Sequence, residues 1–387
     1  MKKTLLLALL AVLMPTAVDA FDPDDPVIVK SYDFEIDGIF YKIYPGEGVH
    51  VTLNNGSNSY SGDVNIPTNV EYQNEVYVVT GIDPQAFLIC PGLTSVSIPN
   101  SVTTIGIKAF MGCSNLSSIR IPLGVKYIGS QAFNKCENLI KAEFTSIVNL
   151  CNIEFTDAPS NPLYYGKHLY INDEEITDLI IPDNITKIGN SAFCGSAIKS
   201  VTIHNDVAEI GAYAFKGCSE LTSVNIPNSV TSIERRTFEE CTGLTYVTLP
   251  KNISSIAQYA FRDCPILNEV YCYAKDVPDF HPLAFKVDDS YFTEEKYHGL
   301  TLYVPADVID DYKAANESMM FNNILPIPIV GDANKNGEVE IGDVTSVLTL
   351  MANPKAEGYS KKAADVNGSG GIEIGDITAI LTIMAGE

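Results

Sequence analysis

Hydrophobic residues recur along most of the chain in one repeated pattern. Each period is marked by Ala-Phe, or by Thr-Phe in one copy, and the phenylalanines are 22 to 24 residues apart except for one interval of 60. They are Phe87, Phe110, Phe133, Phe193, Phe215, Phe238, Phe261 and Phe285. Around them the consensus A-F-x-x-C-x-x-L-x-x-V-x-I-P-x-x-V-x-x-I returns, most clearly in residues 106–128.

The V-x-I part of this unit alternates apolar and polar positions, which predicts a short strand with both apolar side chains on one face. The proline that follows ends the strand, because it has no N–H to donate to a ladder. The remaining apolar positions cannot be buried within one unit, so successive units must stack and share a core. A strand-led unit of this length indicates a leucine-rich-repeat solenoid.

The unit resembles the repeat of the BspA-like bacterial leucine-rich-repeat proteins, I-P-x-x-V-x-x-I-G-x-x-A-F-x-x-C. The resemblance covers roughly residues 60–305, where Leu302-Tyr303-Val304-Pro305 is similar to the closing strand of that family. It implies an α+β chain with a right-handed leucine-rich-repeat solenoid over residues 60–325, in a secreted or surface-attached protein. Several family members are similar to adhesins that bind host proteins or other bacteria, but the repeat itself identifies no ligand.

Two segments depart from the unit. Residues 21–59 alternate apolar and polar positions, which predicts an N-terminal β cap over the first open turn of the solenoid. Residues 145–178 fall in the interval of 60, and we expect an extra hairpin inserted into one repeat. Two interpretations of this insertion stay open: a purely structural element, which we favour, and a loop that contacts a ligand, since insertions in repeat proteins often lie on a binding face.

The first 20 residues have the order of a secretory signal. Lys2 and Lys3 precede an apolar run from Leu5 to Met14, and Val18-Asp19-Ala20 predicts cleavage near Ala20. No later stretch approaches the ~18 consecutive apolar residues that span a bilayer, so we expect no transmembrane segment. The predicted location is secreted, extracellular or associated with the cell surface.

Six of the nine cysteines occupy the same position of the repeat. They are Cys90, Cys113, Cys136, Cys218, Cys241 and Cys264. In a solenoid this position points inward, where cysteine acts as a small hydrophobic residue. Stacked turns bring such cysteines close together, but their parallel side chains favour no particular pair. We therefore expect free, buried thiols, and no Cys/His spacing of a zinc site occurs.

Residues 329–387 contain two similar loops with the spacing of oxygen ligands that calcium requires. Each has oxygen-bearing side chains at positions 1, 3, 5, 9 and 12, a backbone carbonyl at position 7 and glycine at position 6. The expected ligands of two Ca²⁺ ions are Asp332, Asn334, Asn336, Glu338, Glu340 and Asp343 in the first loop, and Asp365, Asn367, Ser369, Gly371, Glu373 and Asp376 in the second. Each loop leads into an apolar-patterned helix, over residues 344–351 and 377–384.

Position 12 is Asp rather than Glu in both loops, and no helix of normal length precedes the first loop. In both respects the tail resembles the type I-like dockerin family, whose small all-α domain docks onto a cohesin domain of a scaffold or surface protein. The resemblance implies cohesin contacts at Ile341, Gly342, Val347, Leu348, Ile374, Gly375, Ile380 and Leu381. Both copies carry Glu-Ile-Gly-Asp, so either copy could face the partner.

Composition narrows the possible partners. The chain has 48 acidic against 25 basic residues, a net charge of −23, and this argues against nucleic acid because no Lys/Arg cluster is available to contact phosphates. Most of the excess lies between residues 21 and 330 and indicates a solvated solenoid surface. With 46% hydrophobic and 19% charged residues, the chain is expected to fold.

The outward positions of the last repeat strands offer a candidate ligand face. It comprises Tyr246, Thr248, Glu269, Tyr271 and Tyr273, and exposed tyrosines are common anchors of protein interfaces. An alternative is that these tyrosines only cover the end of the core.

No nucleophile elbow, His-Glu-x-x-His, phosphate loop or acid/base pair is present, so we predict that the protein is not an enzyme. The predicted function is binding of an extracellular protein or glycan by the repeats, with docking of the tail onto a cohesin. The alternative is an accessory component of a dockerin/cohesin complex that degrades polysaccharides.

Overall fold

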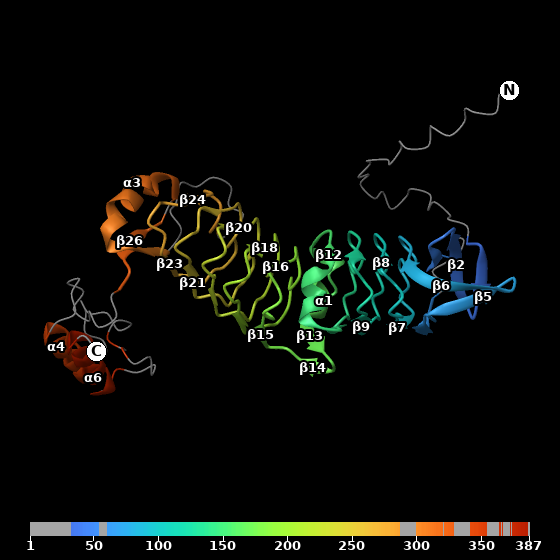
Figure 1. Cartoon of the computed structure of the whole chain (residues 1–387), viewed down its shortest axis with the longest axis horizontal. Helices are drawn as coiled ribbons and strands as arrows, with labels where there is room; N and C mark the ends of the chain where they lie inside the picture. Colours follow the sequence, from blue (N-terminus) through green and yellow to red (C-terminus); the bar gives the residue numbers. More distant parts are fainter. Residues whose placement is uncertain are drawn as a thin grey trace, which may run out of the picture.

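The repeats wind into a solenoid with two rows of parallel strands. The computed structural model describes residues 32–53, 60–286, 299–319, 321–328, 341–353, 364, 366, 372 and 374–385. In Figure 1 the two rows follow opposite edges of the repeats.

The first strand row contains the V-x-I segments. Its members are β4 (Gly62–Asn65), β7 (Leu93–Ser97), β9 (Ser118–Ile121), β11 (Lys141–Phe144), β13 (His168–Ile171), β15 (Asp178–Ile180), β17 (Ser200–Thr202), β19 (Ser223–Asn225), β21 (Tyr246–Leu249), β23 (Glu269–Cys272), β25 (Thr301–Val304) and β26 (Asn323–Pro326). Equivalent residues pair between neighbouring turns, as Val224, Val247 and Val270 do. The strand predicted at each V-x-I segment is therefore confirmed.

The second strand row is built mainly of two-residue strands. It comprises β6 (Glu75–Ile82), β8 (Thr104–Ile105), β10 (Tyr127–Ile128), β12 (Glu154–Phe155), β16 (Lys187–Ile188), β18 (Glu209–Ile210), β20 (Ser232–Ile233), β22 (Ser255–Ile256) and β24 (Asp279–Phe280). At the N-terminal end, β1 (Phe34–Ile36), β2 (Ile39–Tyr44) and β3 (Gly48–Val51) form an antiparallel meander. Strand β3 pairs with β6, and β5 (Asn69–Tyr72) forms a hairpin with β6, so the meander continues directly into the solenoid.

The core between the two rows is a stack of phenylalanine rings. Phe238 is fully buried, with its ring centroid 5.4 Å from that of Phe215 and 5.2 Å from that of Phe261. The consensus cysteines lie beside this stack, and all but Cys90 bond to the preceding turn: Cys264 Sγ donates to the carbonyl of Phe238 at 3.2 Å. Cys113, Cys136, Cys218 and Cys241 make the same bond to Phe87, Phe110, Phe193 and Phe215.

All nine cysteines lie in the described part of the chain, and each is buried and free, as predicted for the six at the shared repeat position. The thiols are more than small hydrophobic groups, because each S–H adds a donor to a buried carbonyl; the Phe238 carbonyl, for example, also accepts the Cys241 N–H at 3.4 Å.

The insertion at residues 145–178 is larger than the expected hairpin. The hairpin of β13 with β14 (Glu174–Glu175) is present, but the residues before it form a complete additional turn of the solenoid. This turn runs through α1 (Ile147–Asn152), β12, η1 (Ala158–Ser160) and α2 (Leu163–Gly166) into β13.

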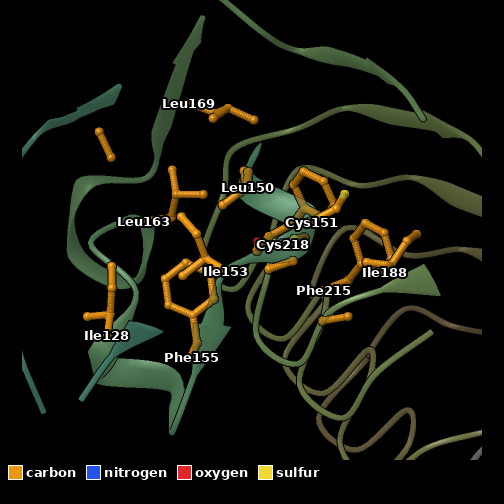
Figure 2. Packing of buried hydrophobic residues seen from close by; sticks show 14 of the residues in the cluster. Ile128, Leu150, Cys151, Ile153, Phe155, Leu163, Leu169, Ile188, Phe215 and Cys218 are labelled. Carbon is orange, nitrogen blue, oxygen red and sulfur yellow. Dashed lines mark hydrogen bonds between the residues drawn. The ribbon is translucent and has the colours of Figure 1, made fainter. Parts of the chain in front are cut away.

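The extra turn lacks the Ala-Phe marker. Phe133 N–H donates to the carbonyl of Pro159, where the other turns donate to alanine or, in one turn, to Thr237, so Pro159 and Ser160 occupy the Ala-Phe positions. The ring stack is interrupted there, and Figure 2 shows Leu150 and Cys151 of α1 together with Leu163 in the core at this point. Helix α1 thus supplies the apolar volume that the missing phenylalanine would have given.

A short helical cap closes the other end of the repeats. It consists of η2 (Ala306–Val308), α3 (Ile309–Met319) and the edge strand β26. The Tyr312 hydroxyl is buried and donates to the carbonyl of Ala274 at 2.9 Å, and the ring of Phe321 packs against Phe285 with centroids 5.4 Å apart. These contacts cover the last ring of the phenylalanine stack.

The C-terminal segment has its own core. Helices α4 (Ile341–Ala352) and α6 (Ile374–Ala385) include the two predicted helices, and Val347, Leu350 and Ile380 are buried between them with Ala364. In the part of the chain that the structure describes, no helix combines the length and apolar character needed to cross a membrane. The predicted signal at residues 1–20 lies outside the described residues.

Candidate functional site

An open groove of about 940 Å³ follows the ends of five successive strands of the first row. Its lining comes from the residues directly after β17, β19, β21 and β23, together with Pro305 after β25. These strands are in the yellow and orange part of the solenoid in Figure 1, where β21 and β23 are labelled. The groove therefore crosses the turns of the solenoid instead of lying within one of them.

Four rings occupy equivalent positions along this groove. The register of β19, β21, β23 and β25 aligns Asn225 with Thr248, Tyr271 and Tyr303, so the residues two places further on also align. These are Pro227, Pro250, Tyr273 and Pro305, and all four line the groove. Tyr273 replaces the consensus proline in its turn, and its side chain is 45% exposed. Pro227 and Pro250 are buried and Pro305 is half-buried, so Tyr273 is the exposed member of this row.

Polar side chains flank the ring row. Asn225 and Thr248 lie on their strands two residues before Pro227 and Pro250. Asn205, Asn228 and Lys251 share the repeat position that comes directly after the ring position, in three successive turns. The Asn205 side-chain oxygen accepts the Asn228 N–H at 3.2 Å, which fixes the first amide against its neighbour. Because neighbouring parallel strands are ~4.8 Å apart, amide and hydroxyl groups are presented at regular steps along the groove.

The groove carries almost no net charge. Its charged lining residues are Lys251, Lys275 and Asp276, and Lys275 Nζ is paired with Asp307 Oδ2 at 2.6 Å. Both partners of that pair are exposed, and the ion pair raises the pKa of Lys275 and lowers that of Asp307. A neutral surface in a chain of net charge −23 is a local exception.

The five residues of the expected ligand face do not form one exposed surface. Thr248 and Tyr273 line the groove, whereas Tyr246, with 39% of its surface exposed, lies on the sheet beside it. The expectation of an exposed Tyr271 is wrong: this side chain is 4% exposed because its ring stacks on that of Tyr303, with centroids 4.7 Å apart.

The Tyr271 hydroxyl donates to Glu269 Oε2 at 2.8 Å. Burial, together with this bond to a carboxylate, raises the pKa of Tyr271 well above its ordinary value. Tyr271 therefore covers the core, as the alternative proposed, and Glu269 holds its hydroxyl.

The sequence pattern did not single out the polar residues that follow the ring position of the groove. Asn205, Asn228 and Lys251 each lie in an ordinary I-P-x-x-V segment, or the equivalent I-H-x-x-V and L-P-x-x-I, and none is unusual within its own repeat. Aligning the repeats and reading each position down successive turns would have found them, since residues at one repeat position become spatial neighbours in a solenoid.

Apart from the groove, a cluster of charged side chains lies at the turns after Phe215, Phe238 and Phe261. Glu239 is 1% exposed and lies 2.5 Å from Lys216 Nζ and 3.1 Å from Arg236 Nη1. The carboxylates of Glu239, Glu240 and Asp263 are close enough to share a cation. Lys216 also pairs with Glu240, and Arg262 with Asp263, so the cations of the chain already balance these carboxylates. We interpret the cluster as a structural ion-pair network.

The expected cohesin contacts are only partly on the surface of the C-terminal helices. Val347 and Ile380 have no exposed surface because they pack in the core between α4 and α6, so their assignment as partner contacts is wrong. Leu348 is 50% exposed and Leu381 46% exposed at the equivalent positions of the two helices, and Ile374 is 70% exposed. The structure does not describe the exposure of Ile341, Gly342 and Gly375.

The expected calcium ligands also lie mostly outside the described side chains. The exception is Asp376, which is fully buried in the first turn of α6. A carboxylate without contact to solvent needs compensating positive charge or hydrogen bonds. Its place at the end of the second loop fits position 12 of a calcium loop.

Comparison with known proteins identifies the repeats. The profile of the BspA type leucine rich repeat region matches residues 78–161 and 164–290 in six copies. A leucine-rich repeat protein from Bacteroides ovatus is similar with a TM-score of 0.52 and 22% identity, over 77% of each chain.

Two further solved structures align over most of the repeats. A leucine rich cell surface protein from Faecalibacterium prausnitzii has a TM-score of 0.36 and 19% identity over 76% of this chain and 94% of that chain. The pneumococcal vaccine antigen PcpA has a TM-score of 0.41 and 16% identity over 76% of this chain and 98% of that chain. No curated protein sequence matches the chain.

Proposed function

Since the chain belongs to the family of BspA-type leucine-rich repeat proteins, we propose that it is a non-enzymatic, secreted or surface-attached binding protein. Its repeats bind an extracellular protein or glycan, and its C-terminal segment docks in a calcium-dependent manner onto a cohesin. The groove across five turns carries the first half of this proposal, because a concave surface with a few convergent polar groups is the usual form of a ligand site.

The docking half rests on the duplicated loops and on the two helices that follow them. Two Ca²⁺ ions would neutralise the crowded loop carboxylates and so favour the folded segment. Leu348 and Leu381 offer the same apolar group at equivalent places on α4 and α6. Either helix could therefore meet the partner.

The ligand class is tested by applying the full chain to an array of glycans and to a panel of extracellular matrix proteins. Specific binding to either class supports the proposal, and binding to neither contradicts it. The alternative function, an accessory role in a polysaccharide-degrading complex, is favoured by selective binding to plant or microbial polysaccharides together with capture by cohesin.

The docking half is tested by cohesin capture of the full chain with calcium and with a chelator. We expect capture only with calcium. Leu348→Asp and Leu381→Asp should each leave capture nearly intact because the other helix remains available, whereas the double variant should abolish it. Calcium-dependent helix content, measured by circular dichroism, serves as the folding control. Calcium-independent capture, or complete loss in one single variant, would contradict this arrangement.

A further inference from the structure

The ring row and its polar flanks identify the class of ligand that the groove fits. From this geometry we infer that the groove binds a neutral, extended glycan chain, with one sugar ring packed on Tyr273 and its neighbours lying against the polar side chains of the adjoining turns. This inference rests on the proposed binding function and deepens it, because it names one ligand class and one place.

The spacing of the groove matches a polymer of pyranose units. Successive turns of the core are separated by ring distances of 5.2 to 5.4 Å in this region, as the Phe215, Phe238 and Phe261 stack shows. This step is close to the length of one sugar residue in an extended glycan. A chain lying across the turns would therefore meet the same type of protein group at each successive residue.

The chemistry of the lining also suits a neutral sugar. The C–H face of a pyranose packs on an aromatic ring, and Tyr273 offers an exposed ring with a polar tip. Sugar hydroxyl groups both donate and accept hydrogen bonds, as do the amides of Asn225 and Asn228 and the hydroxyl of Thr248. Both asparagines are exposed, and the Asn228 side chain takes part in none of the hydrogen bonds described above.

A protein ligand is less well matched by the same surface. Protein interfaces are centred on several buried apolar or aromatic anchors and cover about 800 Å² on each partner. The groove has one accessible aromatic ring, and Tyr246, the next exposed tyrosine, lies outside its lining. An acidic glycan is disfavoured because Lys275 is already paired with Asp307, and the other charged lining residues are one lysine, Lys251, and one carboxylate, Asp276.

The test measures binding of the full chain to soluble neutral oligosaccharides by isothermal titration calorimetry. The probes are cello-, xylo-, manno- and malto-oligosaccharides of two to six residues, with an oligogalacturonate as the acidic comparison. We expect at least one neutral series to bind, with affinity rising up to about five residues because the groove crosses five turns.

Substitutions in the groove then test where the oligosaccharide binds. Tyr273→Ala should weaken binding about tenfold, the loss of one well-packed aromatic contact, while Tyr273→Phe should keep most of the affinity. Asn228→Ala should weaken it about fivefold. Asn100→Ala is the matched control, because Asn100 lies in an identical I-P-N-S-V segment of an early turn outside the groove, and it should change nothing. Thermal unfolding of each variant confirms that the fold is intact.

The outcomes separate this inference from the wider proposal. Neutral oligosaccharides that bind equally well to the wild type, Tyr273→Ala and Asn228→Ala overturn the placement of the ligand. Binding of a matrix protein but of no neutral oligosaccharide, with sensitivity to Tyr246→Ala, overturns the glycan inference and leaves the proposed binding function standing. Binding of neither class overturns both.

Discussion

The cysteine ladder makes the stability of the repeats depend on alkaline pH in a way that one substitution can reveal. Cys264 is 3% exposed, and its thiol donates to the Phe238 carbonyl at 3.2 Å. Burial raises the pKa of this thiol to about 12 from the ordinary value of 9.0. The folded chain therefore keeps the proton at pH 10, whereas the unfolded chain releases it.

The sign and size of the effect follow from this difference. Because the unfolded state binds fewer protons above pH 9, the free energy of unfolding must fall as the pH rises. At pH 10, one unit above the unfolded-state pKa, each such thiol destabilises the folded chain by about 1.4 kcal/mol relative to pH 7. Cys264→Ser keeps a hydrogen-bond donor at the position and removes the titration.

Urea unfolding at pH 7 and pH 10, followed by circular dichroism with a reductant present, measures the difference. Tyrosine and lysine titrations are common to both proteins, so they cancel when the two pH dependences are subtracted. The wild type should lose about 1.4 kcal/mol more than Cys264→Ser between the two pH values. Cys218→Ser, at an equivalent thiol whose pKa burial also raises to about 12, should behave in the same way. Equal pH dependence in the wild type and both variants would refute a buried, protonated ladder.

Three further results are expected. Phe238→Ala should lower the free energy of unfolding by about 3–5 kcal/mol, measured by urea unfolding, because it removes a fully buried ring from the middle of the stack. Glu239→Gln should cost about 3–5 kcal/mol because Lys216 and Arg236 lose their buried counter-charge. The adjacent Glu240→Gln is the control, and it should cost under about 1 kcal/mol because that side chain is half exposed. Ellman's reagent at pH 8 should react with none of the nine thiols in the folded chain and with all of them after unfolding.

The repeat pattern predicted the parts of the fold that depend on a residue's own position in the unit. A phenylalanine or cysteine at a fixed place points into the core in every turn, so one correct unit predicts many buried residues. The buried apolar positions of the repeat and the free thiols are both of this kind. Their prediction needed no knowledge of which residues lie in neighbouring turns.

Features that depend on neighbouring turns were harder to predict. Tyr271 alternates outward on its strand, but the ring of Tyr303 one turn later covers it. The extra turn after Phe133 was hidden because Pro159 joins it through a backbone carbonyl, and the backbone bond does not require the consensus side chain. The cap formed by α3 was missed for a related reason: Tyr312 contacts Ala274 and Cys272, far away in the sequence.

The same distinction explains where a solenoid can place a specific site. Residues that follow the consensus must serve the shared core, and they vary little from turn to turn. Departures at exposed positions are free of that requirement, and the register sets them beside one another across the turns. Tyr273 stands where Pro227 and Pro250 stand in the preceding turns, and it is this departure that turns a row of proline rings into a surface with an accessible aromatic face. The specificity of the groove therefore depends on the order of the repeats, so exchanging the turn that contains Tyr273 for a consensus turn should remove the site without changing the fold.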